Sequence, residues 1–125
     1  MKKIYTEKAP EAVGPYSQAI VSGNYVFTSG QLGIDENGSL GDGILKQTEN
    51  ALKNLSEVLI AAGSNLSKVL KTTCFLADIR EFTVFNEVYG RYFTEKPARS
   101  LIEASNLPKG ALVEIEAIAE ISEKS

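Results

Sequence analysis

The sequence predicts an α+β fold, a mixed β-sheet with two helices on one face, and two features of its hydrophobic pattern support this. Apolar residues recur three and four positions apart over 45–63 and again over 78–93, which is the period of an amphipathic helix. The other apolar segments are short runs of β-prone residues bounded by turns, as strands are. The resulting order is β-β-α-β-α-β-β, which suits a domain with its helices together on one face of a sheet.

The first half of the chain contains a predicted hairpin and the first helix. A short strand is expected near Lys3–Thr6, and the hairpin spans 18–30 around Gly23-Asn24, a pair that tolerates the positive φ of a two-residue turn. The helix over 45–63 ends at Gly63, because glycine readily adopts the left-handed conformation that follows many helices. The predicted core stripe of this helix consists of Leu45, Thr48, Leu52, Leu55, Leu59 and Ala62.

The second half of the chain alternates strand and helix. A strand is predicted over 68–78, and Asp78 and Glu81 then have the D-x-x-E spacing of a capping box, which marks a helix start. Two further strands, over 98–105 and 111–122, are separated by a turn that contains proline and glycine. The predicted apolar stripe of the second helix consists of Phe82, Phe85, Tyr89 and Phe93.

The last predicted strand has two unlike faces, because alternate residues of a strand point to opposite sides of the sheet. The apolar side, which suits the helices, carries Val113, Ile115, Ala117, Ala119 and Ile121. The mixed side carries Leu112, Glu114, Glu116, Ile118 and Glu120. Two helices cover only one side of a sheet, so Leu101 and Ile118, expected on the uncovered side, predict that another subunit packs there in a homo-oligomer.

Length and composition predict a single globular domain, 1–125. The chain has 125 residues, 43% hydrophobic and 23% charged, which is the usual balance for a soluble domain of this size. Its N-terminal segment lacks the apolar run of a signal peptide, and no segment approaches the length of a membrane span. A cytoplasmic protein is therefore expected.

Several residue types and motifs are missing, and their absence narrows the chemistry. The chain has no histidine, so the usual general base and the commonest transition-metal ligand are absent and no metal site is predicted. Cys74 is the single cysteine, which excludes an internal disulfide and is expected to be an inert buried thiol. There is no nucleotide-binding glycine loop, and a net charge of −3 with scattered lysines does not form the basic footprint that nucleic acid needs. Chemistry must come from carboxylates, hydroxyls, arginine, lysine and the backbone.

Arg99 is the first candidate site residue because of its residue type and its place. The chain has ten lysines but only three arginines, and Arg99 follows Pro97 at the start of a predicted strand. A guanidinium is a rigid planar fork that binds a carboxylate through two parallel hydrogen bonds. The alternative is a solvated charge at a strand start, and the sequence leaves both interpretations open.

Glu114 and Glu116 are candidates for acid–base chemistry, since they share the mixed face of the last strand. A carboxylate in a partly dry interface can position a water molecule and accept its proton. The alternative is an exposed polar face, and spacing alone does not choose between them.

Four further residues are candidates for binding a ligand. Asn86 lies at the edge of the second helix's apolar stripe, where a buried amide needs hydrogen-bond partners, either structural ones or a ligand. Ser29 and Gly30 end the hairpin, and a glycine there would let a ligand approach the backbone. Tyr16 follows a Gly-Pro turn and is either a pocket residue or an aromatic at the rim of the core.

Together these stretches resemble one known family, the RidA family, also called the YjgF or L-PSP family, and specifically its arginine-bearing branch. The resemblance runs nearly end to end and rests on GPYSQA at 14–19, TSGQL at 28–32, FNEVYGRYF at 85–93, PARS at 97–100 and LPKGALVEIEAIA at 107–119. It implies a chorismate-mutase-like fold that assembles as a homotrimer, with ligand pockets in the clefts between subunits.

The resemblance also implies an activity, the hydrolytic deamination of reactive 2-imino or enamine acids, such as 2-aminoacrylate and 2-iminobutanoate, to 2-oxo acids and ammonia without cofactor or metal. By the same resemblance, Arg99 would hold the substrate carboxylate and Glu114 would position the attacking water. Binding residues would be Tyr16, Ser29, Gly30 and Asn86, together with Leu101, where relatives often carry a smaller or polar residue. Leu101 would therefore alter the shape of the pocket and its substrate preference.

Three other functions remain open at this point. A non-catalytic module that binds a 2-oxo acid or similar small carboxylate would use the same Arg99. An endoribonuclease or translation inhibitor is also attributed to parts of the family, although the acidic composition and the missing histidine argue against it. A chaperone-like surface role would not require Arg99.

Overall fold

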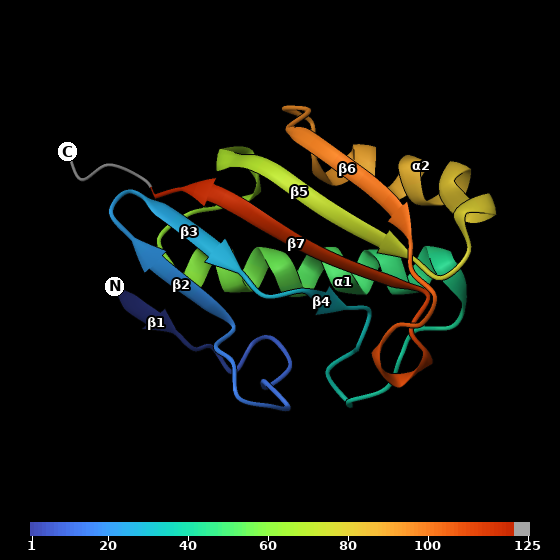
Figure 1. Ribbon diagram of the computed structural model, residues 1–125, viewed down its shortest axis with the longest axis horizontal. Coiled ribbons are helices and arrows are strands. Elements are labelled where there is room, and N and C mark those ends of the chain that lie inside the picture. The colour runs from blue at the N-terminus through green and yellow to red at the C-terminus, as the bar shows by residue number, and fades with distance from the viewer. Residues whose placement is uncertain (122–125) are drawn as a thin grey trace.

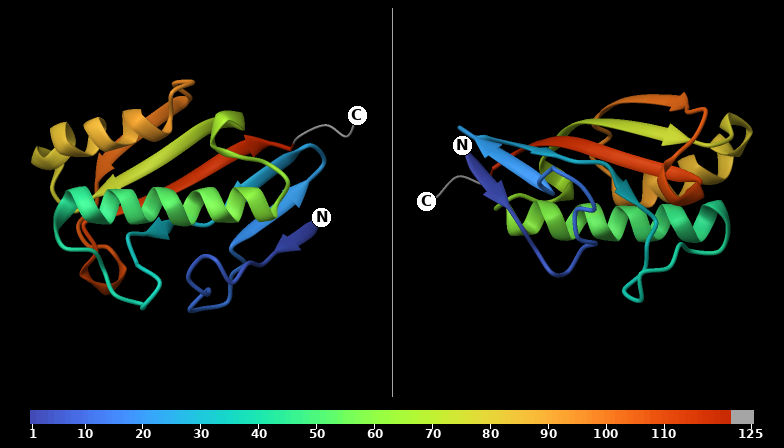
Figure 2. Two further views of the ribbon diagram at one scale, coloured as in Figure 1. Left: turned by 180° about the vertical axis from the view of Figure 1, so that it is seen from behind. Right: turned by 60° about the horizontal axis from the view of Figure 1, so that its bottom comes forward.

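The computed structural model describes residues 1–121 and confirms the α+β prediction (Figure 1). Over these residues a seven-stranded sheet carries two α-helices, and Figure 2 shows both helices on the same side of the sheet. The strands are β1 Lys2–Ile4, β2 Ala19–Ser22, β3 Tyr25–Thr28, β4 Gln31–Leu32, β5 Val69–Leu76, β6 Ala98–Glu103 and β7 Val113–Glu120. The helices are α1 Gly43–Ala61 and α2 Phe82–Tyr92, with 3₁₀ turns at Leu66–Lys68, Ile79–Glu81 and Pro108–Gly110.

The sheet is mixed, as predicted, because one strand pair is parallel. The strand order is β1-β2-β3-β7-β5-β6, and β4 pairs with β7 further along the edge that β3 occupies. Only the β5–β6 pair is parallel among the pairs in residues 1–121, and α2 provides the crossover between these two strands. β4 has two residues, too few for an alternating pattern, and the sequence did not predict it.

The hydrophobic core fills the space between the helices and one face of the sheet. The alternation predicted for β7 is confirmed: its buried residues are Val113, Ile115, Ala117 and Ala119. They meet the fully buried α1 residues Thr48, Ala51, Leu52, Leu55, Val58 and Leu59. Cys74 is fully buried on β5, and burial raises the pKa of its thiol to about 11, which makes it a poor nucleophile as predicted.

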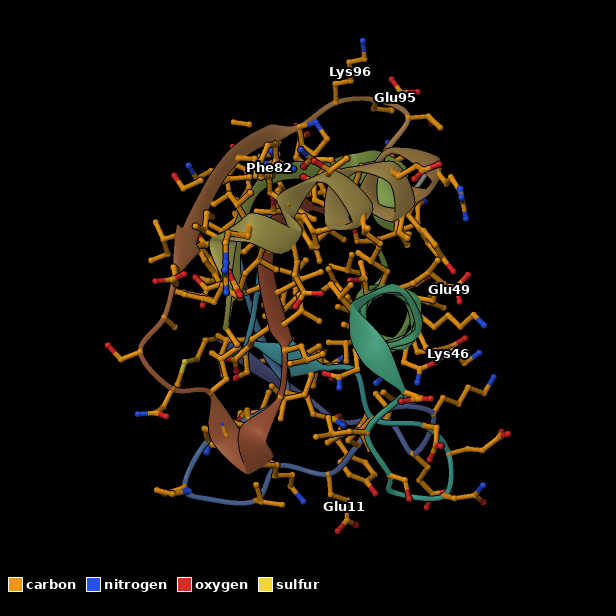
Figure 3. All side chains as sticks on the ribbon, turned by 90° about the vertical axis from the view of Figure 1, so that its right-hand side faces the viewer. Glu11, Lys46, Glu49, Phe82, Glu95 and Lys96 are labelled. Carbon is orange, nitrogen blue, oxygen red and sulfur yellow. The ribbon has the colours of Figure 1, made fainter. Side chains whose placement is uncertain are left out.

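Two residues assigned to helix stripes are not in the core. Leu45 is 47% exposed, and its neighbour Ile44 is buried in its place, because α1 already begins at Gly43. Phe82 is also 47% exposed, whereas the other members of its predicted stripe are buried. Figure 3, a view along α1, shows Lys46 and Glu49 projecting from that helix away from the sheet.

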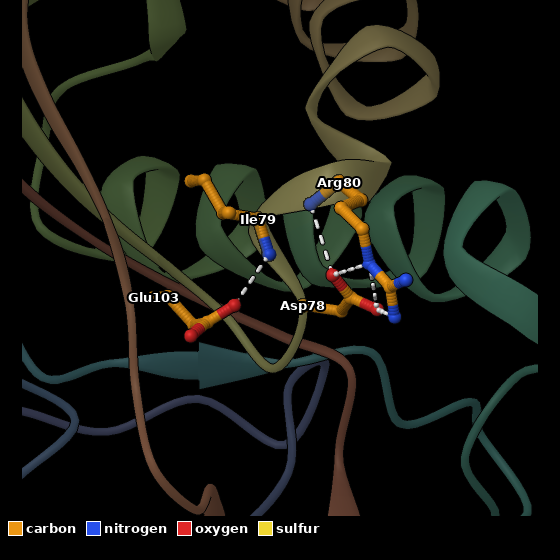
Figure 4. A network of polar contacts seen from close by, with 4 residues as sticks. All are labelled: Asp78, Ile79, Arg80 and Glu103. Atoms are coloured by element: carbon orange, nitrogen blue, oxygen red, sulfur yellow. Dashed lines mark hydrogen bonds and ion pairs between the residues drawn. The ribbon is translucent and has the colours of Figure 1, made fainter.

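The predicted capping box does not form at the start of α2. The Asp78 carboxylate accepts a hydrogen bond from the backbone N–H of Arg80 at 2.9 Å, and so caps the 3₁₀ turn Ile79–Glu81 that precedes the helix (Figure 4). The Arg80 guanidinium folds back onto the same carboxylate at 2.7 Å, and the Ile79 N–H donates to Glu103 at 2.9 Å. Asp78 therefore caps the 3₁₀ turn between β5 and α2. A residue that capped α2 directly would lie about one turn later in the chain.

Leu101 does not lie on the uncovered face of the sheet, and the prediction that placed it there is wrong. In the parallel register of β5 and β6, Leu101 is opposite Cys74 and Arg99 is opposite Thr72, and both partners are fully buried beneath the helices. Leu101 is accordingly half-buried against the core. Ile118 does lie on the uncovered face, since it alternates with the buried residues of β7.

Candidate active site

The guanidinium of Arg99 is held by α2. Its Nη1 donates a hydrogen bond to Asn86 Oδ1 at 2.8 Å. Its Cζ atom lies 4.8 Å from the ring centroid of Tyr89 and 5.8 Å from that of Phe85. A cation over an aromatic face is attracted by the negative potential of the ring. The helix therefore holds the guanidinium through one hydrogen bond and two aromatic contacts, and Arg99 is not a freely solvated strand-start charge.

A cavity of about 400 Å³ opens beside Arg99, between the end of α2 and the start of β6. It is lined by Tyr89, Gly90, Phe93, Thr94, Lys96, Pro97 and Arg99. Figure 3 shows Lys96 on the loop that joins these two elements. The cavity thus combines an aromatic wall with two cationic side chains, which suits a small organic anion.

Glu114 belongs to a second group of candidate residues, with Gly30 and Tyr16. All three line a groove of about 1260 Å³ bounded by the N-terminal segment, the loop after β4 and α1. A Cβ atom at position 30 would lie 2.7 Å from both Cγ and Cδ of Glu114, so the carboxylate arm occupies the space that the glycine leaves free. Gly30 therefore leaves room for the Glu114 side chain. The group that comes close to its backbone is part of the protein itself.

The environment of Glu114 disfavours its charge. Partial burial raises the pKa of its carboxyl group, and the negative charge of Glu116 on the same face of β7 raises it further. A carboxylate with a raised pKa is a stronger base than an ordinary surface glutamate. Glu114 can therefore accept a proton from a bound water more readily than a solvated carboxylate would.

Ser29 supports this second group from behind. Its Oγ donates to the backbone carbonyl of Ser17 at 2.6 Å, next to Tyr16, and Ser29 N–H donates to the Gln18 carbonyl at 2.9 Å. Gln18 is buried, and its side-chain amide accepts a hydrogen bond from the Thr6 N–H and donates one to the Thr6 carbonyl. These two bonds fix the segment before β2. Ser29 thus holds the loop that carries Tyr16.

The seven predicted site residues form two groups on opposite faces of the sheet. Arg99 and Leu101 lie on the helix face, and Asn86 contacts Arg99 from α2. Glu114 points to the other face, since its neighbours Val113 and Ile115 are buried beneath the helices. Tyr16, Ser29 and Gly30 belong with Glu114. One copy of the chain therefore does not bring Arg99 and Glu114 to the same point.

Sequence reasoning missed Tyr89, which was assigned only to the core. Tyr89 follows Asn86 by three residues, so both lie on one face of α2. That spacing was the available signal, but the contact with Arg99 depends on how α2 packs against β6.

No cluster of three His, Cys, Asp or Glu side chains in residues 1–121 is arranged to hold a metal ion, and no helix there could span a membrane.

Replacing Gly30 should test the close packing of Glu114. Gly30→Ala is expected to lower the free energy of unfolding by about 1 kcal/mol, the lower end of the range for overpacking, because the Glu114 arm can partly move aside. Glu114→Ala in the same chain should remove most of that loss. Urea unfolding of the four proteins in this cycle measures the coupling, and an equal loss with and without the Glu114 side chain would contradict it.

The fold has close counterparts among solved structures. RidA from an Antarctic Psychrobacter is 44% identical, with a TM-score of 0.94 over 97% of this chain and 100% of that one. Escherichia coli TdcF, solved with bound serine, is 38% identical, with a TM-score of 0.93 over 98% of this chain and 100% of that one. The chain is thus an α+β protein of the RidA fold, and the resemblance to the RidA family is confirmed, while the arginine-bearing branch stays a prediction.

Sequence comparison identifies the family. The profile described as Endoribonuclease L-PSP matches residues 6–121. A RutC family protein of Pyrococcus abyssi is 50% identical over 93% of this chain and 94% of its own length. The human 2-iminobutanoate/2-iminopropanoate deaminase is 44% identical over 93% of this chain and 87% of its own length. This chain belongs to the Endoribonuclease L-PSP family, which includes the RidA proteins.

Proposed function

We propose that this protein hydrolyses small reactive 2-imino acids, such as 2-iminobutanoate and the imine of 2-aminoacrylate, to 2-oxo acids and ammonia. The observation that carries the proposal is the guanidinium of Arg99, which lies over the Tyr89 ring and is hydrogen-bonded to Asn86 beside a cavity. A rigid guanidinium beside such a cavity suits a small organic anion. The names of the human and rodent relatives, 2-iminobutanoate/2-iminopropanoate deaminase, support the same activity.

In the proposed mechanism Arg99 binds the substrate carboxylate through two hydrogen bonds and so fixes the plane of the adjacent imine. Glu114 holds a water molecule against C2 and accepts its proton as the oxygen attacks. A carbon–oxygen bond forms, and Glu114 passes the proton to the imine nitrogen, which gives a carbinolamine. The remaining hydroxyl proton then moves to the same nitrogen through Glu114, the carbon–nitrogen bond breaks, and ammonia leaves as the carbonyl forms. One water is consumed, and no oxidant, reductant, metal or cofactor is required. Tyr16 lines the pocket, and Leu101 borders the Arg99 side and limits the substrate's side chain.

We further propose that two subunits build each site, in a homotrimer. Arg99 and Glu114 face opposite sides of their own sheet, so a site that contains both needs the Glu114 face of a neighbouring copy. The uncovered face also exposes apolar side chains, with Phe27 44% and Ile102 49% accessible. Packing that face against another copy would bury them.

Imine trapping tests the proposed activity. An amino-acid oxidase generates 2-imino acids in the presence of semicarbazide, and semicarbazone formation is followed with and without the protein. The proposal expects the protein to divert imine from the trap and release 2-oxo acid. Unchanged trapping with both small and large imino acids would overturn it.

A non-catalytic carboxylate-binding module is the second candidate, favoured by the Escherichia coli relative solved with bound serine. Such a module would bind a 2-oxo acid in calorimetry and leave the imine trap unaffected. Incubation with labelled RNA separates both functions from the nuclease activity in the family's description.

A cytoplasmic location is also proposed; a relative in Arabidopsis thaliana is named chloroplastic.

Mixed oligomers test whether each site is shared between subunits. Arg99→Ala and Glu114→Gln should each abolish most activity alone. In a mixed oligomer, some sites combine the intact Arg99 of a Glu114→Gln subunit with the intact Glu114 of an Arg99→Ala subunit. Random assembly of equal amounts should restore about a quarter of the wild-type activity in the whole mixture, and about a third in trimers that contain both variants. Co-expression of the two variants with different affinity tags measures this recovery. No recovery in tag-purified mixed oligomers would contradict a site that is shared between subunits.

A further inference from the structure

Behind Arg99 lies a second contact that the proposed chemistry does not use. The hydroxyl oxygen of Tyr89 is 2.8 Å from Oγ1 of Thr72, a fully buried residue of β5. The Tyr89 ring also packs on Phe93, with their centroids 4.5 Å apart, and on Phe85 at 5.5 Å. Tyr89 is thus fixed at its hydroxyl end by the sheet and at its sides by its own helix. The face that remains carries the guanidinium of Arg99.

We infer that Tyr89 is a positioning residue for carboxylate capture: its ring, packed against Phe85 and Phe93, fixes the plane of the Arg99 guanidinium, and its hydroxyl bond to Thr72 contributes to stability only. This inference rests on the proposed role of Arg99 in binding the substrate carboxylate.

The hydrogen bonds of Arg99 explain why a ring is needed. Within residues 1–121 the guanidinium donates one side-chain hydrogen bond, from Nη1 to Asn86. A single bond fixes one point and leaves the plane free to turn about it. The Tyr89 face removes that freedom, while Nε and Nη2 remain available as the two parallel donors that a carboxylate requires. Because the Arg99 side chain is already ordered before the ligand binds, binding loses less side-chain entropy.

The two ends of the Tyr89 side chain therefore have separable effects. Removing the hydroxyl takes a partner from buried Thr72 and should lower stability, but the ring stays under Arg99. Removing the ring frees the guanidinium and should weaken carboxylate binding. A residue with a purely structural role would show both effects together.

Three variants separate these effects, with the affinity for 2-oxobutanoate measured by calorimetry, KM in the imine assay and Tm by thermal melting. Tyr89→Phe should lower Tm and keep the affinity within about twofold, while Tyr89→Leu should weaken affinity and raise KM about three- to tenfold. Thr72→Val is the matched control, since it removes the same hydrogen bond from the other side. It should lower Tm as Tyr89→Phe does, with the affinity of the wild type.

A ring-fluorinated phenylalanine at position 89 keeps the result interpretable if the leucine variant does not fold. Fluorine withdraws charge from the ring face at almost unchanged shape, so affinity should fall about two- to fivefold relative to Tyr89→Phe if the ring holds the cation. Equal affinity of the two rings, or wild-type affinity in a folded Tyr89→Leu protein, would overturn the inference.

The wild-type control distinguishes this inference from the proposed function. If the protein binds 2-oxobutanoate but hydrolyses no imine, the deaminase proposal fails and the Tyr89 comparison still decides the inference. If it neither binds nor hydrolyses, both are overturned.

Discussion

Arg99→Ala is expected to lower kcat/KM for imine hydrolysis about 100-fold or more, because it removes the two charge-assisted hydrogen bonds that the proposed mechanism assigns to the substrate carboxylate. The loss should exceed that of one binding contact, since the same fork sets the orientation of the imine toward the attacking water. The fold should survive, because the Arg99 side chain lies at an exposed edge strand. Far-UV circular dichroism and the imine assay on the same preparation measure both quantities.

Two other substitutions serve as controls for Arg99. Arg99→Lys keeps the positive charge but loses the planar fork, so it should recover only a small part of the activity. Arg91→Ala removes an arginine that does not line the cavity and pairs loosely with Glu87 at 3.9 Å on the surface of α2, so it should leave the activity unchanged. Activity within twofold of wild type in Arg99→Ala would contradict the carboxylate role.

The helices and long strands were predictable because apolar residues recur at a regular spacing along the whole length of each element. The β7 pattern identified the buried face residue by residue. The start of each helix was less predictable: Leu45 and Ile44 are both apolar, and only the packing of the first turn of α1 decides that Ile44 is buried. β4 depends on pairing with β7 and has no local signal of its own.

The candidate site was predictable as a set of residues but not as an arrangement. Strand alternation relates residues within one strand, such as Glu114 and Glu116. It does not relate Arg99 on β6 to Glu114 on β7, because that relation depends on the register through β5. The same gap led to the wrong face for Leu101. A long-range register is set by the whole core, so no local pattern could have placed the two groups of candidate residues on opposite faces.

Glu114→Gln should have two opposite effects, a loss of activity and a gain of stability. Loss of the proton acceptor should lower kcat about 10²–10⁴-fold at neutral pH. The stability effect follows from the raised pKa of Glu114, which means that the folded protein binds this proton more tightly than the unfolded chain does. Ionising Glu114 therefore destabilises the fold as the pH rises from the ordinary glutamate range through the raised value, and glutamine avoids that loss.

The pH profile links the two effects to one group. Wild-type activity should fall on acidification through the raised pKa of Glu114, and the Tm advantage of Glu114→Gln should shrink over the same interval and vanish below the ordinary range of a glutamate. Glu116→Gln removes the neighbouring like charge, so it should lower the pKa of Glu114 and move the acid limb of the activity profile to lower pH. An acid limb that is unchanged in Glu116→Gln, together with a Tm of Glu114→Gln no higher than wild type at neutral pH, would mean that Glu114 is an ordinary solvated carboxylate. A general base would then have to be sought elsewhere in the groove.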